Sequence, residues 1–307
     1  MFVPDQRARD YLLRSSGFSG IVASPGRGLA IELGSPLGGA DLKTQLSQLK
    51  GNEFISCRAL GISQLYVRDG VVEFDAAASE IRVSPLEGGG LVPYLALETA
   101  LGQALLRQGG LVVHALGFEY AGRGVLVVGP TMSGKTTLAL SAALAGVRLL
   151  SDDRVLLSLD ADGVVAKGFR PYLQIRRGTL QGLSGLSVFD WFAGHCAANA
   201  EVVHVHRDEA PSLFVETAWV RDVLFLSHRD RGSETRVKSV HQAAMLSWMV
   251  ENSCPYYFYG TNGAEREHIA HLATLCGCLN AYQVSVGTDL LADPVKEFYK
   301  LMGALDV

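Results

Sequence analysis

The sequence predicts an α/β protein with a mixed sheet, preceded by a small β-rich N-terminal region. Three observations predict this fold class. A strand, a loop, a helix and another strand follow one another between residues 111 and 150, a hairpin rather than a helix comes next, and short β-type runs dominate the first 90 residues. The chain has 307 residues, enough for two domains of about 150 residues each. We therefore expect a β-rich region at 1–90 and a larger α/β domain at 91–307.

The boundary lies at a glycine-rich stretch, residues 84–90, because three successive glycines lose too much backbone entropy to lie in a regular element. Before it, β-type runs at 63–67 and 71–74 are joined by Asp69-Gly70, which is typical of hairpin turns. Leucines at helical spacing predict a helix over 41–49, and another over 93–108 that ends at two glycines.

The elements of the larger domain are predicted from changes in hydrophobic period. In chain order they are strands at 111–120 and 125–128, a helix at 135–145, strands at 147–150, 155–159 and 164–169, a strand at 220–226, helices at 240–250 and 265–276, a strand at 282–286 and a helix at 294–305. Residues 160–163 read Asp-Ala-Asp-Gly, a turn sequence that predicts a hairpin between the strands on either side.

Composition excludes several classes of protein. The chain has 27 basic and 31 acidic residues, a net charge of −4, and so lacks the basic excess that nucleic-acid binding requires. Its five cysteines form no C-x-x-C pair, which indicates neither a disulfide framework nor a zinc knuckle. The N-terminus does not resemble a secretory signal, and no apolar run approaches the roughly 20 residues of a spanning helix. We expect a cytoplasmic protein with no membrane or nucleic-acid partner.

The strongest motif lies between the predicted strand at 125–128 and the helix that follows it. Residues 129–136 read GPTMSGKT and match the phosphate-binding loop G-x-x-x-x-G-K-[ST] at every fixed position. Backbone N–H groups of such a loop turn inward around phosphate oxygens, and the helix N-terminus adds partial positive charge. The residues expected to bind a nucleotide are Gly129, Pro130, Thr131, Met132, Ser133, Gly134, Lys135, Thr136 and Thr137. We expect Lys135 on the β- and γ-phosphates and the Thr136 hydroxyl on Mg²⁺.

Two acidic residues, Asp152 and Asp153, end the strand that returns from the loop helix. The carboxyl ends of neighbouring parallel strands face the same crevice, so these carboxylates are expected beside the phosphates. One would hold Mg²⁺ and the other would accept the proton of an attacking hydroxyl. Both can serve only if the strand has already bent into a loop, because successive strand residues point to opposite faces. The alternative is a solvated turn that merely ends the strand.

Other polar residues give weaker signals. His114 falls in a predicted strand, where a histidine is more often a hydrogen-bonded core residue than a catalytic one. Arg170, Arg176 and Arg177 follow the hairpin and would neutralise charge on a transferring phosphoryl group, although arginines are also common on solvated loops. His195, Cys196, His204 and His206 invite a zinc interpretation, because His204 and His206 would share one face of a strand, but no second pair of ligands has a recognisable spacing.

Four segments together, residues 114–120, 124–129, 133–137 and 149–155, resemble the catalytic core of HPr kinase/phosphorylase and its smaller relatives. The resemblance is strong from residue 114 to 157 and weaker from there to the C-terminus. It implies a P-loop kinase fold of the HPr kinase and phosphoenolpyruvate carboxykinase type, in which a hairpin follows the aspartates. It also implies an active site of His114, Lys135, Thr136, Asp152 and Asp153, with Asp152 as the base for a serine hydroxyl and Asp153 as a metal ligand.

The chain departs from that family at two places. Thr137 stands where the family usually has an acidic residue, and the chain reads Gln174-Ile175-Arg176-Arg177-Gly178 where the family has a glutamate before an Ile-Arg-Gly run. Both departures count against phosphorolysis and against HPr as the substrate. They favour the reduced members of the group, several of which are thought to phosphorylate serine in ribosomally made peptides, including lasso peptide precursors.

The sequence thus predicts an ATP- and Mg²⁺-dependent kinase that phosphorylates a serine of a peptide or protein, with Asp152, His114, Lys135 and Arg176 as catalytic residues. Whether the chain forms a homo-oligomer is left open. One alternative is a small-molecule kinase of the shikimate or nucleoside-monophosphate type, which would have helical backbone at 164–169. Another is a non-catalytic nucleotide-binding module that acts by complex assembly, with nucleotide affinity but no turnover.

Overall fold

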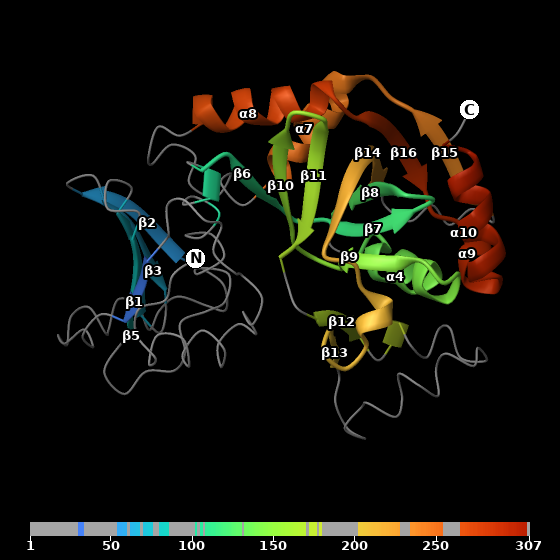
Figure 1. Ribbon diagram of the computed structural model, residues 1–307, viewed down its shortest axis with the longest axis horizontal. Helices are drawn as coiled ribbons and strands as arrows, with labels where there is room; N and C mark the ends of the chain where they lie inside the picture. Colours follow the sequence, from blue (N-terminus) through green and yellow to red (C-terminus); the bar gives the residue numbers. More distant parts are fainter. Residues whose placement is uncertain are drawn as a thin grey trace. The chain divides into compact units, whose positions relative to one another are not determined.

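The computed structural model describes residues 30–33, 54–59, 62–67, 70–75, 80–85, 102, 105–106, 108–130, 132–169, 172–176, 178–179, 202–227, 234–253 and 265–305 (Figure 1). The chain divides into two compact units, Met1–Val112 with Cys254–Ile269, and Val113–Ser253 with Ala270–Val307. The predicted boundary at residue 90 falls outside the described residues and stays a prediction. So do the helix at 41–49, most of the helix at 93–108, and the predictions on Thr131, Arg170 and Arg177.

The first unit contains a five-stranded sheet with the order β1-β5-β4-β3-β2. Its strands are β1 (Ala30–Leu33), β2 (Phe54–Ala59), β3 (Ile62–Val67), β4 (Gly70–Asp75) and β5 (Glu80–Pro85). Strands β2 to β5 form an antiparallel meander, and β1 runs parallel to β5. The predicted hairpin between the two β-type runs is present as β3 and β4, but Gly70 pairs with Val67 and so belongs to β4 rather than to the turn. Ser84 and Pro85, predicted as linker, belong to β5.

The second unit contains a curled mixed sheet covered by helices (Figure 1). The elements after the first sheet are β6 (Gly110–Val113), β7 (Leu116–Tyr120), β8 (Arg123–Val128), α4 (Lys135–Leu144), β9 (Arg148–Ser151), β10 (Val155–Asp160), β11 (Gly163–Gly168), β12 (Tyr172–Arg176), β13 (Val202–His206), the 3-10 helix η1 (Pro211–Leu213), β14 (Thr217–Leu226), β15 (Arg236–Ser239), α7 (Gln242–Glu251), α8 (Glu265–Gly277), β16 (Asn280–Ser285), α9 (Asp289–Ala292) and α10 (Pro294–Gly303). Most of the predicted elements are present, with bounds within a few residues of those expected. The strand expected at His204 and His206 is present as β13, whereas β12, β15 and α9 were not predicted.

Within the second unit, this sheet has the strand order β10-β11-β14-β8-β7-β9, and β16 and β15 extend it beside the second half of β14. The predicted sequence of strand, loop, helix and strand is therefore present as β8, α4 and β9. However, β9 does not lie next to β8, because β7 is inserted between them and pairs antiparallel with both. Strands β8 and β9 still run parallel to each other, so their carboxyl ends point in the same direction.

The core lies between this sheet and the helices α4 and α10. Leu138, Ala139 and Ala142 of α4 are fully buried apolar residues, and Phe298 of α10 packs its ring 5.6 Å from that of Phe118 on β7. Helix α10 begins where predicted, because the Asp293 side chain accepts a hydrogen bond from the backbone N–H of Lys296 and Pro294 is the first helical residue. This packing fixes α4, and with it the loop at its N-terminus. No helix of the described ranges is long and apolar enough to cross a membrane.

The strand predicted at 111–120 is in fact two strands, broken at His114 and Ala115. The backbone N–H of His114 donates to the carbonyl of Asn252 at 2.6 Å, and that of Ala115 donates to the carbonyl of Asp153 at 3.0 Å. These two bonds go to remote loops, so the ladder is interrupted at this point. His114 therefore lies in a break between strands rather than within one.

The hairpin predicted around residues 160–163 is confirmed. Strands β10 and β11 pair antiparallel, with Asp160 opposite Gly163. The backbone from Val164 to Gly168 is a strand, not a helix. This removes the feature on which the small-molecule kinase alternative depended.

A tight contact at the end of β11 gives a prediction about stability. Gly168 lies against the Leu150 carbonyl and the Arg207 guanidinium, and an added Cβ would collide with both. Gly168→Ala is expected to lower the free energy of unfolding by about 1–3 kcal/mol, as overpacking does. Urea unfolding measures this, with Gly303→Ala as the matched control, because nothing lies within 4 Å of a Cβ there. Equal stability of the two variants would contradict the packing at Gly168.

Candidate active site

A cleft of about 630 Å³ opens in the second unit where β8, β9 and β12 end. Its lining residues come from the loop after β8 and the start of α4, from the turn after β9, from β12 and from α9. They are His114, Met132, Ser133, Gly134, Lys135, Thr136, Thr137, Asp152, Asp153, Arg154, Gln174, Arg176, Gly178, Thr179 and Leu291. The structure thus brings together in one cleft the predicted loop residues from Met132 to Thr137, both aspartates, His114 and Arg176. Gly129 and Pro130, also predicted to bind the nucleotide, are not among the lining residues, but their carbonyl oxygens accept hydrogen bonds from Lys135, which is.

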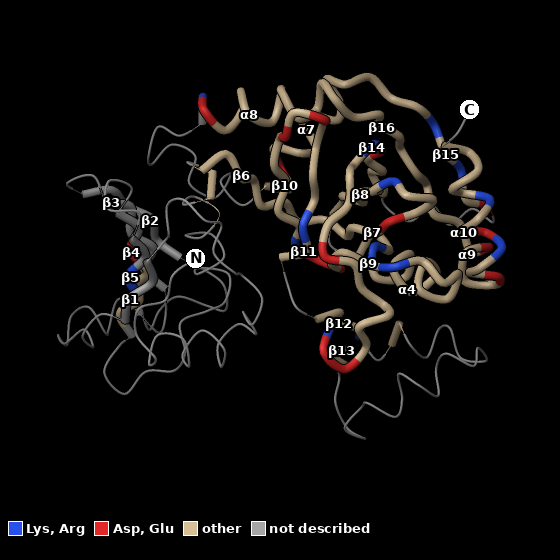
Figure 2. The backbone as a smooth tube through the Cα atoms, in the orientation of Figure 1, with Lys and Arg blue, Asp and Glu red and all other residues tan. Residues whose placement is uncertain are grey.

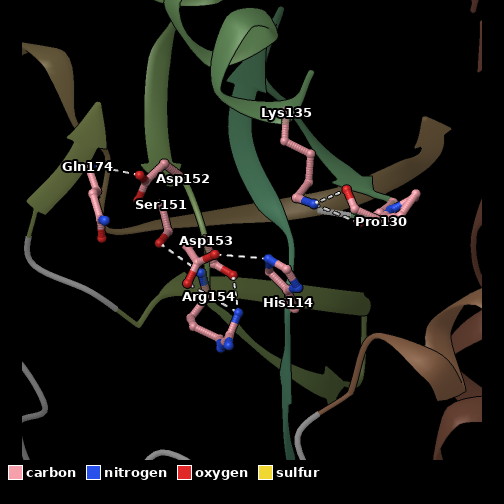
Figure 3. Close-up of polar contacts among 9 residues, drawn as sticks. His114, Pro130, Lys135, Ser151, Asp152, Asp153, Arg154 and Gln174 are labelled. Atoms are coloured by element: carbon pink, nitrogen blue, oxygen red, sulfur yellow. Dashed lines mark hydrogen bonds and ion pairs between the residues drawn. The ribbon is translucent and has the colours of Figure 1, made fainter. Parts of the chain in front are cut away.

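The Lys135 ammonium group binds the first two residues of the loop between β8 and α4. Lys135 Nζ donates to the carbonyl oxygens of Gly129, at 2.6 Å, and Pro130, at 3.1 Å (Figure 3). Gly129 has φ +153°, and a Cβ there would lie 2.6 Å from the Leu226 carbonyl oxygen, so the position requires glycine. The start of the loop therefore holds the ammonium group through two backbone carbonyls.

The loop also carries groups suited to phosphate oxygens. Gly134, with φ +106°, directly precedes α4, so the first backbone N–H groups of a buried helix point toward the cleft. The hydroxyl oxygen of Ser133 is buried and has no hydrogen-bond partner among the described residues. A buried hydroxyl without a partner is costly, and a phosphate oxygen would supply one. These residues fit the phosphates of a nucleoside triphosphate.

Burial changes the protonation equilibrium of Lys135. Desolvation lowers the pKa of Lys135 from 10.5 to about 8; Asp153 opposes this shift and Arg154 adds to it. A triphosphate placed against Nζ would favour the ammonium form and raise that pKa again. Nucleotide binding is therefore expected to take up a proton at pH values above about 8.

This expectation can be measured. Because only the protonated Lys135 offers a charge, the affinity for ATP is expected to be about tenfold lower at pH 9 than at pH 7. Isothermal titration calorimetry at pH 9 in two buffers of different ionisation enthalpy should show proton uptake on binding. A binding enthalpy that does not depend on the buffer would contradict the lowered pKa of Lys135.

The two aspartates lie in the turn between β9 and β10, so the strand has bent before it reaches them, as their joint use requires. They contact different neighbours (Figure 3). Asp152 is buried, and its Oδ2 accepts a hydrogen bond from the backbone N–H of Gln174 at 2.7 Å. Asp153 is partly exposed, with Oδ1 2.9 Å from His114 Nε2 and Oδ2 3.1 Å from Arg154 Nη1. The first carboxylate is thus tied to β12 and the second lies among the cationic and imidazole groups.

His114 contacts Asp153 and not Asp152, the aspartate predicted to be the base. Burial lowers the pKa of His114, Asp153 partly opposes this, and Arg154 lowers it further. A neutral imidazole at neutral pH can still donate its Nε2 hydrogen to Asp153 Oδ1. We therefore regard His114 as a positioning residue for Asp153.

A pair of variants tests this role. If the cleft transfers a phosphoryl group with Mg²⁺ on Asp153, His114→Ala is expected to reduce that activity 10- to 100-fold and to raise the Mg²⁺ concentration needed for half-maximal activity, because Asp153 loses its orienting donor. His114→Gln places an amide N–H near the position of Nε2 and is expected to restore part of both. If the Mg²⁺ dependence of His114→Ala equalled that of wild type, His114 would not act through Asp153.

Sequence reasoning missed two contributors to the site. Arg154 is 7% exposed and brings Nη1 to both the carboxylate and the backbone carbonyl of Asp153. Its position directly after the two aspartates was a usable signal. Gln174 contributes its backbone N–H to Asp152, which no side-chain motif reveals. Arg176, which was predicted, is exposed at the end of β12, with Nη1 3.1 Å from the Met132 sulfur.

No protein-family model matches this chain, and no curated protein is detectably similar to it. Among solved structures, the Hpr(Ser) kinase/phosphatase from Coxiella burnetii is similar at 12% sequence identity with a TM-score of 0.30. The match covers 63% of this chain and 98% of that one. A likeness at this level does not say what this chain binds, so its function has to be inferred from the cleft.

Proposed function

We propose that this protein is an ATP- and Mg²⁺-dependent kinase that transfers the γ-phosphoryl group to a serine hydroxyl of a peptide or protein. The observation that carries the proposal is the common cleft of the Lys135 loop and the two aspartates. A triphosphate gripped by the loop would have its outermost phosphate next to carboxylates that hold a metal and accept a proton. That combination is what phosphoryl transfer to a hydroxyl requires.

The loop side of the cleft would bind the donor. Lys135 and the backbone N–H groups at the start of α4 neutralise and orient the phosphates. The Thr136 hydroxyl and the Asp153 carboxylate are the groups that would hold Mg²⁺, which offsets charge on the β- and γ-phosphates when it is bound. Asp153 suits this role because it is close enough to Lys135 to raise the pKa of that lysine. His114 and Arg154 fix the orientation of its carboxylate.

The β12 side of the cleft would bind the acceptor. Asp152 is tied to this strand through Gln174, so it is the carboxylate suited to accept the proton of an incoming serine. As the serine Oγ–P bond forms, the bond from the γ-phosphorus to the bridging oxygen breaks and ADP leaves. The serine proton passes to Asp152. Arg176, at the rim, offsets charge on the group in transit.

The test is to incubate the purified protein with ATP, Mg²⁺ and peptides encoded beside its gene. Mass spectrometry should show one added phosphate on a serine, accompanied by an equal amount of ADP. Nucleotide binding without phosphate on any acceptor, and without ADP formation, would favour the assembly-module alternative. Phosphate on a small metabolite but on no peptide would favour the small-molecule alternative.

A further inference from the structure

Met132, in the loop before α4, combines two features that are unusual for a methionine. Its backbone has φ +67°, in the left-handed region that favours glycine, and among the described residues only one other non-glycine residue has a positive φ. Its side chain is 75% exposed, whereas Met245, Met249 and Met302 are buried in the core. Neither the backbone conformation nor the core therefore explains why a methionine stands at this position.

The Met132 side chain connects two walls of the cleft. Its sulfur accepts a hydrogen bond from Arg176 Nη1 at 3.1 Å. Both residues line the cleft, Met132 from the loop and Arg176 from the end of β12. Of the five described residues of β12, Arg176 alone is charged (Figure 2). The contact thus links the loop proposed to hold the donor to the strand that binds Asp152 through Gln174.

A thioether is a suitable partner for an arginine that acts on a phosphoryl group. Arg176 is exposed at the end of its strand, and a long exposed side chain samples many orientations unless a contact limits them. Sulfur is a weak and uncharged acceptor, so it orients the guanidinium without neutralising its charge as a carboxylate would. A guanidinium has several N–H donors, so the bond to sulfur leaves others for phosphate oxygens.

We propose that Met132 is a positioning residue for phosphoryl transfer, whose sulfur holds the Arg176 guanidinium at the opening of the loop, against the phosphoryl group in transit. The proposal rests on the kinase function proposed above. It accounts for a methionine where the backbone favours glycine, because glycine has no side chain with which to contact Arg176. Met132 acts through Arg176, so loss of its sulfur should slow transfer and leave nucleotide affinity unchanged.

Kinetics of the full chain test this role. Met132→Leu keeps the backbone N–H and most of the side-chain volume but lacks the acceptor. It is expected to lower kcat about fivefold, the factor that one ordinary hydrogen bond contributes, with unchanged affinity for ATP by calorimetry. Met132→Gln places an amide oxygen close to the position of the sulfur and should restore most of kcat. In an Arg176→Gln background, Met132→Leu should have no further effect, because the partner is already absent.

A second measurement follows the contact without using activity. NMR spectra are recorded of the protein with isotope-labelled methionine methyl groups, and the Met132 signal is assigned by its absence in Met132→Leu. Arg176→Gln is expected to shift this signal, both in the free protein and with a non-hydrolysable ATP analogue and Mg²⁺ bound. Arg236→Gln, the same change at an exposed arginine of β15 that does not line the cleft, should leave the signal at its wild-type position.

Three results would overturn the role of Met132. They are a wild-type kcat in Met132→Leu, equal losses of kcat in Met132→Leu and Met132→Gln, and a Met132 signal that does not respond to Arg176→Gln when the analogue is bound. Each of them leaves the kinase function standing if the wild-type protein phosphorylates an acceptor. Absence of phosphate on every acceptor would instead remove the kinase function, and with it the role of Met132, whatever the methyl signal shows.

Discussion

Lys135→Ala is expected to lower phosphoryl transfer about 1,000-fold and to remove measurable binding of MgATP. Removing one preorganised group that stabilises developing charge typically costs that much. Lys135 also binds the start of the loop, since Nζ bonds the carbonyl oxygens of Gly129 and Pro130. The variant therefore loses both the cation and the two hydrogen bonds to the loop. Initial rates with ATP and an unphosphorylated acceptor peptide measure the loss of transfer, and calorimetry measures the loss of MgATP binding.

Two further variants separate these effects. Lys135→Met keeps most of the side-chain volume without the charge and is expected to be as inactive as Lys135→Ala. Lys238→Ala, an exposed lysine on β15, is expected to behave like wild type. Transfer by Lys135→Met within tenfold of wild type would show that the ammonium group does not act on the phosphates.

Asp152→Asn is expected to lower kcat by 10²- to 10⁴-fold, roughly the contribution of a general base, while ATP binds as tightly as before. The amide oxygen of asparagine can still accept the backbone N–H of Gln174, so the link to β12 is expected to survive. Only the capacity to take a proton is lost. Asp153→Asn should differ, because its carboxylate is proposed to hold Mg²⁺, and the variant should need a higher Mg²⁺ concentration.

Rapid-quench measurement of the transfer step, with Mg²⁺ varied, distinguishes the two variants. If Asp152→Asn turned over at a near-normal rate and Asp153→Asn did not, the roles of the two aspartates would have to be exchanged. Asp153 would then be the base, and His114 would orient it through their contact.

The sequence predicted those parts of the structure that depend on local pattern. The loop from Gly129 to Thr136 has fixed spacing, and the Asp-Ala-Asp-Gly turn specifies its hairpin by itself. Strand pairing could not be predicted in the same way, because hydrophobic period identifies an element but not its neighbours. The insertion of β7 between β8 and β9 is of this kind.

The candidate site shows the same limit. Residues with a side-chain signature, such as Lys135 and Asp152, were found from the sequence and line one cleft. The break at His114 was missed because its cause is a hydrogen bond to Asn252, more than a hundred residues away along the chain. The link from Gln174 to Asp152 was missed because a backbone N–H is present at almost every residue.

The most direct test is a crystal structure of the protein with a non-hydrolysable ATP analogue and Mg²⁺. The triphosphate is expected in the loop, with Lys135 Nζ on the β- and γ-phosphates and Mg²⁺ on Thr136 and Asp153. Asp152 should face the γ-phosphorus from the side opposite the bridging oxygen. A nucleotide bound outside the cleft, or an Asp152 carboxylate turned away from the γ-phosphate, would contradict the assignment of this cleft as a phosphoryl-transfer site.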